Sequence, residues 1–160
     1  MSRLDSFIRR MMAQRDILNH ICNGVKGLDG PVIELGLGNG RTFDHLREHF
    51  PDRRIIAFDR VVGSHKSSTP APDNLIIGEI RETAQRFVGI DAALVHADIG
   101  TGYDHKDAVT LTWLPALVAG LLAPGGIVAS GLALDHPQLE PRPIPSTVKQ
   151  GRYFLYCRME

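Results

Sequence analysis

The sequence predicts an α/β protein, a three-layer α/β/α sandwich in which helices cover both faces of a mostly parallel, doubly wound sheet. Short apolar runs typical of buried strands alternate along the chain with segments of helical periodicity, and this alternation is typical of βαβ units. The length of 160 residues is that of one domain. With 43% hydrophobic and 22% charged residues, the composition is that of a globular chain and excludes disorder as its main state.

Residues 1–27 predict an amphipathic helix. Apolar side chains recur every three or four positions from Leu4 to Val25, which gives one apolar stripe, and Gly24 or Gly27 is expected to end the helix. Three roles stay open for the stripe: packing on the sheet, covering a site as a lid, or forming a dimer contact. The charged residues spaced along this segment exclude a signal peptide.

The first three strands are predicted where short apolar runs occur, at 31–35, 54–58 and 75–77. The first strand leads into a glycine-rich loop and then into a helix that Pro51 ends, because proline cannot continue a helix. The connection 60–74 is rich in Pro and Ser and predicts mostly loop. A helix around 80–87 is expected after the third strand.

Three further strands are predicted in the second half of the chain, at 92–96, 127–130 and 153–157. One helix is predicted over 107–122, after a polar loop at 98–106. The uncharged stretch 110–134 is long enough to cross a bilayer, but prolines and glycines interrupt it, so it predicts a helix, a tight turn and a buried strand. Residues 135–145 hold four prolines and are expected to be irregular.

Net charge and cysteine content bear on the partners of the chain. Lys plus Arg equal Asp plus Glu at 18 each, so the chain lacks the basic excess typical of proteins that bind nucleic acid. Cys22 and Cys157 lie far apart and form no CxxC pair, so neither a disulfide nor a zinc site is expected. These features predict a cytoplasmic protein with no nucleic-acid or membrane partner.

The glycine loop Gly36–Gly40 is the most informative stretch. It follows a buried strand and opens a helix, and glycine permits positive φ and close approach of a ligand to the main chain. The helix N-terminus offers free N–H groups to a carboxylate or phosphate. Asp59 ends the second strand about 20 residues later, where an acid can bind the ribose hydroxyls, and Glu79 follows the third strand. Together these residues predict a nucleoside site over the carboxyl ends of the strands.

Two details of the loop indicate which nucleoside binds. In the dinucleotide fingerprint GxGxxG the third glycine lets the helix pack closely, whereas here the third glycine, Gly40, comes one position early and Arg41 follows it. Glu34 precedes the first glycine by two residues, where its charge repels a diphosphate and attracts an ammonium group. The loop therefore favours a ligand with one carboxylate, one amine and no phosphate.

At these residues the chain resembles the class I S-adenosylmethionine-dependent methyltransferases of the small, single-domain bacterial type. The resemblance covers most of 31–131. It rests on five segments in order: 34–40, Asp59, 78–80, 91–98 and 121–126. It implies S-adenosyl-L-methionine as the cofactor and a seven-stranded sheet whose last strand, 153–157, is antiparallel.

The resemblance also implies a role for each part of the motif set. The glycine loop would hold the methionine part, with Glu34 near its amino group. Asp59 would bind the ribose, Arg60 and 78–80 would flank the adenine, and the end of the fourth strand would lie beside the sulfonium and the acceptor. The cofactor-binding residues expected in this way are Glu34, Gly36, Gly38, Asn39, Gly40, Thr42, Asp59, Arg60, Gly78, Glu79, Ile80, His96 and Asp98.

The chain is expected to be one domain, 1–160, with no inserted substrate domain. Its three parts are the N-terminal helix 1–27, the nucleoside-binding core 31–131, and a Pro-rich loop with the last strand at 135–160. The acceptor is then recognised by the N-terminal helix, by the 97–106 and 135–147 loops, or by a second subunit of a homo-oligomer.

Methyl transfer requires alignment of donor and acceptor, and it requires a base only where the nucleophile loses a proton. The candidate bases are His96, Asp98, Tyr103, Asp104 and His105. No metal is expected, because His96 stands where cation-dependent O-methyltransferases carry an acid and 128–131 lacks their Asp-Asn pair.

The sequence therefore predicts a methyltransferase that acts on a small-molecule acceptor. Two alternatives stay open. The first is an NAD(P)-binding Rossmann oxidoreductase, which the early third glycine and the lack of a downstream Tyr-x-x-x-Lys pair disfavour. The second is a nucleoside-binding or scaffold module without catalytic activity.

Overall fold

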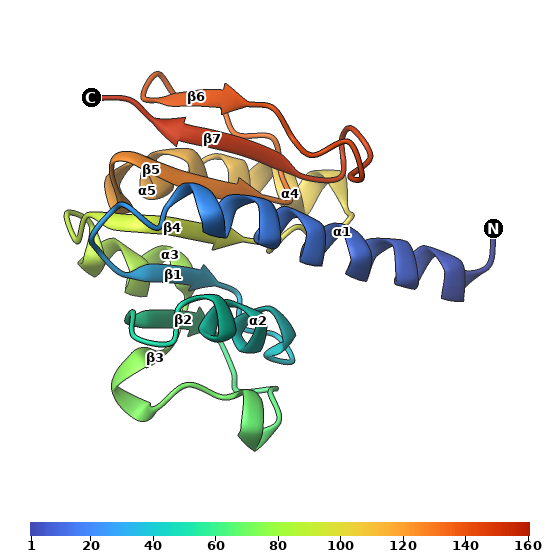
Figure 1. Cartoon of the computed structure of the whole chain (residues 1–160), viewed down its shortest axis with the longest axis horizontal. Coiled ribbons are helices and arrows are strands. Elements are labelled where there is room, and N and C mark those ends of the chain that lie inside the picture. Colours follow the sequence, from blue (N-terminus) through green and yellow to red (C-terminus); the bar gives the residue numbers. More distant parts are fainter.

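The structure is a computed structural model that describes residues 1–160, and at its centre is a seven-stranded sheet of order β3-β2-β1-β4-β5-β7-β6 (Figure 1). Strands β1 to β5 are parallel, β7 runs antiparallel to β5, and β6 runs antiparallel to β7. The predicted α/β class and the antiparallel last strand are confirmed. The strands are β1 Val32–Leu35, β2 Ile55–Asp59, β3 Leu75–Ile77, β4 Ala92–Ala97, β5 Leu122–Ser130, β6 Leu139–Arg142 and β7 Phe154–Arg158.

Helices cover both faces of the sheet, which confirms the three-layer arrangement. Helices α1 and α2 pack on one face, and α3, α4, α5 and the 3-10 turn η3 pack on the other (Figure 1). None of the helices combines the length and the apolar character needed to cross a membrane. The helical elements are α1 Arg3–Gly24, α2 Arg41–His49, η1 Lys66–Ser68, η2 Pro72–Asn74, α3 Ile80–Thr83, η3 Ala84–Phe87, α4 Asp104–Leu111 and α5 Leu114–Leu121.

The central strands supply side chains to two separate cores. In β1, Val32 joins the core under α1 and α2, whereas Ile33 and Leu35 join the core on the opposite face. Every residue of β1 and β4 is buried, as expected of parallel strands that are covered on both sides. Because the faces are covered, ligands can reach these strands only at their ends, and in sheets of this kind they bind at the carboxyl ends.

Helix α1 begins with a capping box, in which Ser2 and Asp5 each bond the backbone N–H of the other. Its second half packs on the sheet through fully buried side chains such as Ile17 and Ile21. Its first half extends past the edge of the sheet (Figure 1). Four apolar side chains of this half are exposed: Leu4, Phe7, Ile8 and Met12. The predicted stripe therefore packs on the sheet over only part of its length.

The helix predicted over 107–122 is two helices in the structure. The chain turns between α4 and α5 at Thr112 and Trp113, and Pro115 lies in the first turn of α5. Inside a single helix this proline would remove a backbone hydrogen bond, whereas in a first turn the missing N–H costs nothing. The connection 60–74 is a loop with two 3-10 turns, which agrees with the prediction.

The prediction that 135–145 is irregular is wrong, because Leu139–Arg142 forms the edge strand β6. Pro141 lies opposite Tyr156 of β7, and a proline is tolerated there because one side of an edge strand makes no backbone hydrogen bonds. Strand β5 also begins at Leu122, earlier than predicted, with a register shift against β4. No helix lies between β5 and β6.

Candidate functional site

The glycine loop joins β1 to α2 at the carboxyl edge of the sheet. Gly36, Gly38 and Gly40 have φ angles of 89°, 55° and 83°, in the left-handed region that favours glycine. A Cβ atom on Gly40 would lie 2.2 Å from the Ser68 carbonyl oxygen, and one on Gly36 would lie 2.7 Å from a methyl carbon of Ile99. A Cβ atom on Gly38 would meet no protein atom, so this glycine leaves the main chain open to the space beside it.

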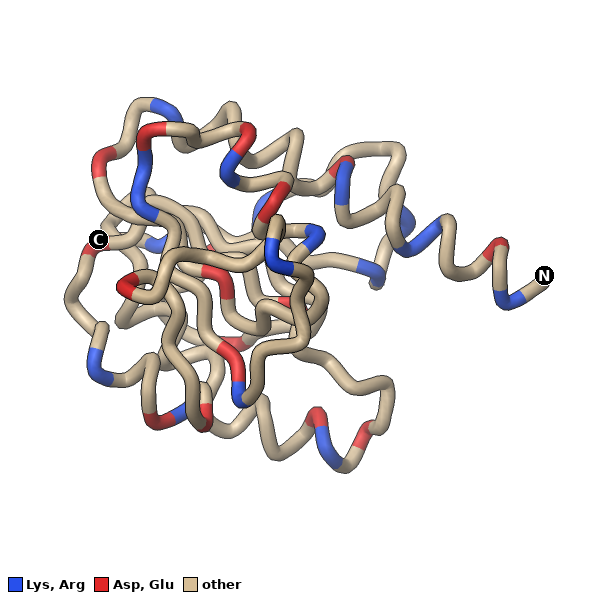
Figure 2. The backbone as a smooth tube through the Cα atoms, turned by 90° about the horizontal axis from the view of Figure 1, so that it is seen from below, with Lys and Arg blue, Asp and Glu red and all other residues tan.

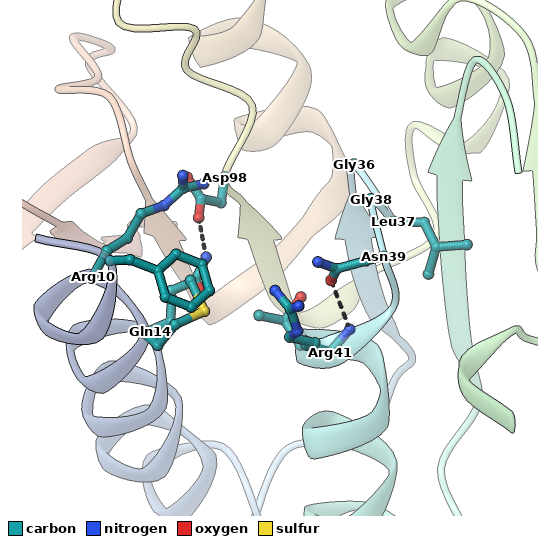
Figure 3. Close-up of a pocket in the computed structure, with 11 residues that line it drawn as sticks. Arg10, Gln14, Gly36, Leu37, Gly38, Asn39, Arg41 and Asp98 are labelled. Carbon is teal, nitrogen blue, oxygen red and sulfur yellow. Dashed lines mark hydrogen bonds between the residues drawn. The ribbon is translucent and has the colours of Figure 1, made fainter. Parts of the chain in front are cut away.

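A pocket of about 220 Å³, here called the first pocket, lies between this loop and the first half of α1. Figure 3 shows Arg10 and Gln14 of α1 on the side of Asp98, with Asn39 and Arg41 across from them. Five of the residues that the sequence assigned to cofactor binding line this pocket: Gly36, Gly38, Asn39, Thr42 and Asp98. Its wall on α1 comes from residues that no motif predicted: Phe7, Arg10, Met11 and Gln14.

Asp59 ends β2, and both of its carboxylate oxygens accept hydrogen bonds within the protein. Its Oδ2 accepts from the Gly38 N–H at 2.9 Å, and its Oδ1 accepts from the Arg60 N–H at 2.7 Å. A carboxylate has about four lone-pair sites, so two remain for a ribose. Asp59 therefore fixes the glycine loop and still presents a carboxylate at the sheet edge.

Arg60, Gly78, Glu79 and Ile80 lie together at the ends of β2 and β3. The Gly78 N–H donates to the Asp59 carbonyl oxygen at 3.0 Å, and the Arg60 guanidinium lies 3.8 Å from the Glu79 carboxylate. Both side chains of this ion pair are mostly exposed, so the pair adds little to stability and can separate readily. None of the four residues lines the first pocket, so they would extend the site along the sheet edge.

Glu34 and His96 are paired across β1 and β4 and are buried beneath the loop. The Glu34 carboxylate accepts a hydrogen bond from the Thr42 hydroxyl at 3.0 Å and lies 2.5 Å from His96 Nδ1. Neither side chain lines the first pocket, and their predicted contacts with the cofactor stay a prediction. Glu34 contacts Thr42 of the pocket wall directly, and His96 contacts Glu34.

The charge state of His96 follows from its surroundings. Burial lowers the pKa of His96, but the charge and hydrogen bond of Glu34 outweigh it, so the pKa lies above its ordinary value of 6.5. The His96 ring stacks on that of Tyr153, with ring centres 6.1 Å apart, and its Nε2 atom is buried without a hydrogen-bond partner. The pair of His96 and Glu34 therefore joins the two central strands directly under the site.

Asp98 ends β4 and is held by residues from both ends of the chain. Its Oδ2 accepts hydrogen bonds from the Tyr153 hydroxyl at 2.8 Å and from the Gln14 amide, the latter drawn in Figure 3. Burial and the charge of Asp98 raise the pKa of Tyr153 above its ordinary value of 10.0, so the hydroxyl stays protonated and donates. A Cβ atom on Gly131 would lie 2.8 Å from Asp98 Oδ1, so a side chain at position 131 would clash with the carboxylate.

A second pocket, of about 320 Å³, lies on the other side of Asp98 and shares Asp98 and Arg10 with the first. Loop residues 100–102 and Arg152 form other parts of its wall. Three predicted bases are exposed and line neither pocket: Tyr103, Asp104 and His105. Of the predicted bases, only Asp98 borders both pockets.

Sequence reasoning missed Gln14 and Tyr153 as partners of Asp98. The two residues lie near opposite ends of the chain, and no spacing pattern predicts contacts over such separations. The sequence feature that could have placed α1 at the site is the apolar stripe along this helix. One of its three open roles, covering a site, fits the position of Phe7 and Met11 in the wall of the first pocket.

Metal-binding and redox groups are sparse in the structure. No three or more His, Cys, Asp or Glu side chains are arranged to hold a metal ion. Both cysteines are free thiols, and burial raises the pKa of the Cys22 thiol to about 12, which makes it a poor nucleophile.

Comparisons with known proteins point to one family. The sequence pattern of a family described as S-adenosyl-L-methionine methyltransferase matches residues 1–158. The crystal structure of an S-adenosyl-L-methionine methyl transferase from Silicibacter pomeroyi DSS-3 is 44% identical in sequence, with a TM-score of 0.90 over 99% of each chain. No curated protein matches this chain.

More distant structures share the fold alone. A TDP-rhamnose 3'-O-methyltransferase of calicheamicin biosynthesis is 20% identical, with a TM-score of 0.61 over 97% of this chain and 83% of that chain. A 16S rRNA (adenine(1408)-N(1))-methyltransferase from Catenulisporales acidiphilia is 11% identical, with a TM-score of 0.52 over 89% of this chain and 91% of that chain. By their names, these two proteins act on a small molecule and on RNA, respectively.

Proposed function

Because this chain belongs to the family of S-adenosyl-L-methionine methyltransferases and is a methyltransferase that uses S-adenosyl-L-methionine, we propose that it methylates a small-molecule acceptor bound beside Asp98. The observation that carries the proposal is the position of this carboxylate between two pockets. The first is bordered by the bare main chain of the glycine loop. The second, at about 320 Å³, has the size of a small-molecule site.

The charges around the first pocket suit the methionine part of the cofactor. Arg41 and the N-terminus of α2 form one side, which favours a carboxylate. Asp98 supplies the carboxylate on the other side, which favours a cation such as an ammonium or sulfonium. The open main chain at Gly38 leaves room for the ligand between them. Asp59 and the Arg60–Glu79 pair would then receive the ribose and the adenine along the sheet edge.

Asp98 has the geometry to accept a proton from the acceptor. Both of its hydrogen bonds go to Oδ2, which leaves Oδ1 free on the side of Gly131, a residue of the second pocket. When bound, S-adenosyl-L-methionine supplies a methyl carbon on a sulfonium: the lone pair of the acceptor forms the new bond, and the C–S bonding pair returns to sulfur. A proton on the nucleophile passes to Asp98 Oδ1 or to water. Alignment of the two reactants supplies much of the rate enhancement.

Calorimetry with S-adenosylhomocysteine tests the cofactor site. We expect the wild-type chain to bind S-adenosylhomocysteine and not NAD, and we expect Gly38→Val to abolish this binding because the side chain fills the first pocket. Gly89→Val is the matched control. Gly89 also has a positive φ, of 91°, and open space around it, but it lines neither pocket. It therefore carries the same backbone strain without reaching the site.

Two results would contradict the proposal. If Gly38→Val binds S-adenosylhomocysteine with the affinity of the wild-type chain, the glycine loop is not part of the cofactor site. The wild-type chain could also bind S-adenosylhomocysteine tightly but transfer no methyl group to any member of a broad set of small acceptors. This result would exclude a small molecule as the methyl acceptor.

A further inference from the structure

Two arginines line the second pocket without a partner of their own. Arg10 comes from α1 and Arg152 from the turn before β7, so the fold brings together cations from distant parts of the chain. None of the ion pairs of the structure includes either guanidinium, and neither has a side-chain hydrogen-bond partner. Arg152 is also only partly exposed. A partly buried guanidinium without a partner favours an anion beside it.

The two acids of the second pocket form no ion pair with these arginines. Asp98 accepts its hydrogen bonds from uncharged donors, as described above, and Figure 3 shows Arg10 beside it without an ion pair between them. Asp107 accepts hydrogen bonds from the Thr101 N–H at 2.8 Å and from the Thr101 hydroxyl at 2.9 Å. Each carboxylate thus accepts its hydrogen bonds on one oxygen from uncharged donors, and neither forms an ion pair with Arg10 or Arg152, so both guanidiniums are available.

The rest of the wall offers little to an apolar molecule. It consists of loop residues 100–102, Gly131, Leu132 and the Tyr153 side chain, so bare main chain makes up much of it. A ligand of this pocket is therefore oriented mainly by its charge.

We propose that the methyl acceptor is a small molecule with a carboxylate or phosphate group, which Arg10 and Arg152 bind in the second pocket. This inference rests on the proposed function and names the substrate class of the same site. With the anion held at the arginines, the nucleophilic O, N or S atom of the acceptor faces Asp98 and the first pocket. Its lone pair forms the bond to the methyl carbon, the C–S pair stays on sulfur, and any proton goes to Asp98 Oδ1 or to water.

A nucleic-acid phosphate is the rival source of negative charge. Arg3, Arg9 and Arg10 lie on the projecting half of α1, which is basic. However, the chain has no net charge, and Figure 2 shows Lys and Arg interspersed with Asp and Glu over the body of the molecule. Polynucleotide binding relies on an extended basic surface, whereas two arginines that line one pocket suit a single anionic group.

The test is a pair of titrations on the full chain. The first measures binding of S-adenosylhomocysteine by calorimetry. The second follows inorganic phosphate and succinate, each added to the S-adenosylhomocysteine complex, by calorimetry and by the amide NMR signals of residues 100–102. We expect saturable binding of at least one anion and a loss of about tenfold or more in its affinity in Arg152→Gln. The control is Arg3→Gln, which removes a charge from α1 outside both pockets and leaves anion affinity unchanged.

The two titrations separate the two ideas. Failure of S-adenosylhomocysteine to bind contradicts the proposed function. Binding of S-adenosylhomocysteine with no anion binding, or with equal anion affinity in wild type and Arg152→Gln, overturns the anionic acceptor alone. Tighter binding of an RNA hairpin than of either anion, weakened equally by Arg3→Gln and Arg152→Gln and falling steeply with salt, overturns it in favour of nucleic acid.

Discussion

Asp59 at the end of β2 and Asp98 directly after β4 lie on either side of β1 at the sheet edge, but their hydrogen bonds differ. Each oxygen of Asp59 accepts one backbone N–H, one from Gly38 of the glycine loop and one from the adjacent Arg60. Asp98 accepts both of its bonds on one oxygen, which leaves the other free. The first arrangement suits a carboxylate that shapes a loop and binds neutral hydroxyls. The second suits a carboxylate that receives a proton.

We predict that Asp59→Ala weakens S-adenosylhomocysteine binding by about 1–3 kcal/mol, because it removes charge-assisted hydrogen bonds to the ribose and frees the Gly38 N–H. Calorimetry measures the change. Asp73→Ala is the control, since Asp73 is an exposed acid of η2 outside both pockets. Equal affinity in wild type and Asp59→Ala would take the ribose role away from this residue.

At the residue scale, the local parts of the site were predictable and the distant ones were not. The glycine loop and Asp59 follow strand ends, and the carboxyl ends of parallel strands meet at one edge, so their proximity follows from the strand pattern. The bonds of Gln14 and Tyr153 to Asp98 depend on how α1 and β7 pack, which no local pattern encodes. Burial of Glu34 was also hidden, because a motif does not reveal on which side of the loop a carboxylate lies.

At the scale of elements, the two halves of α1 make different contacts. The half from Ala13 onward is buried on the sheet, and the half before it mainly contributes to the wall of the first pocket. The packing role left open by the sequence therefore describes the second half of the helix, and the lid role stays a prediction for the first half.

Removal of residues 1–11 should separate these halves. We expect the shortened chain to fold, with a loss of about 1 kcal/mol in stability from the lost helix cap, because the buried side chains of α1 remain. We expect its affinity for S-adenosylhomocysteine to fall by about tenfold or more, since Phe7, Arg10 and Met11 leave the pocket wall. Circular dichroism and calorimetry measure the two effects. Leu4→Gln, which lies outside both pockets, should change neither, and full affinity in the shortened chain would exclude a covering role.

The order of most elements was predictable from hydrophobic periodicity, whereas the division into α4 and α5 and the strand β6 were not. Pro115 was compatible with one long helix or with the first turn of a second one, and tertiary packing selected the second arrangement. Pro141 suggested irregular backbone, yet an edge strand tolerates it. In both cases proline excluded a backbone hydrogen bond at one position without specifying the structure around it.

At the scale of the whole molecule, the site forms only when both ends of the chain are in place. Gln14 of α1 and Tyr153 before β7 both donate hydrogen bonds to Asp98, so the position of this carboxylate depends on the complete fold. The Glu34–His96 pair lies beneath the same edge, between the two central strands. Stability and site geometry are therefore coupled through buried polar groups.

This coupling predicts a pH dependence of the free energy of unfolding. The pKa of His96 is raised in the folded chain, so the folded state holds a proton that the unfolded state has already lost, and stability falls as pH rises from 6.5 towards the raised pKa. This one proton changes the free energy of unfolding by at most about 1.4 kcal/mol per pH unit. Urea unfolding between pH 6.5 and about 7.5, below the titration of unfolded thiols, measures the slope. His96→Gln should remove this slope. If that variant does not fold, NMR titration of the His96 ring in the wild-type chain tests directly whether the pKa is raised. If the free energy of unfolding does not change over this pH range, or if the His96 ring titrates below pH 6.5, the pKa of His96 is not raised in the folded chain.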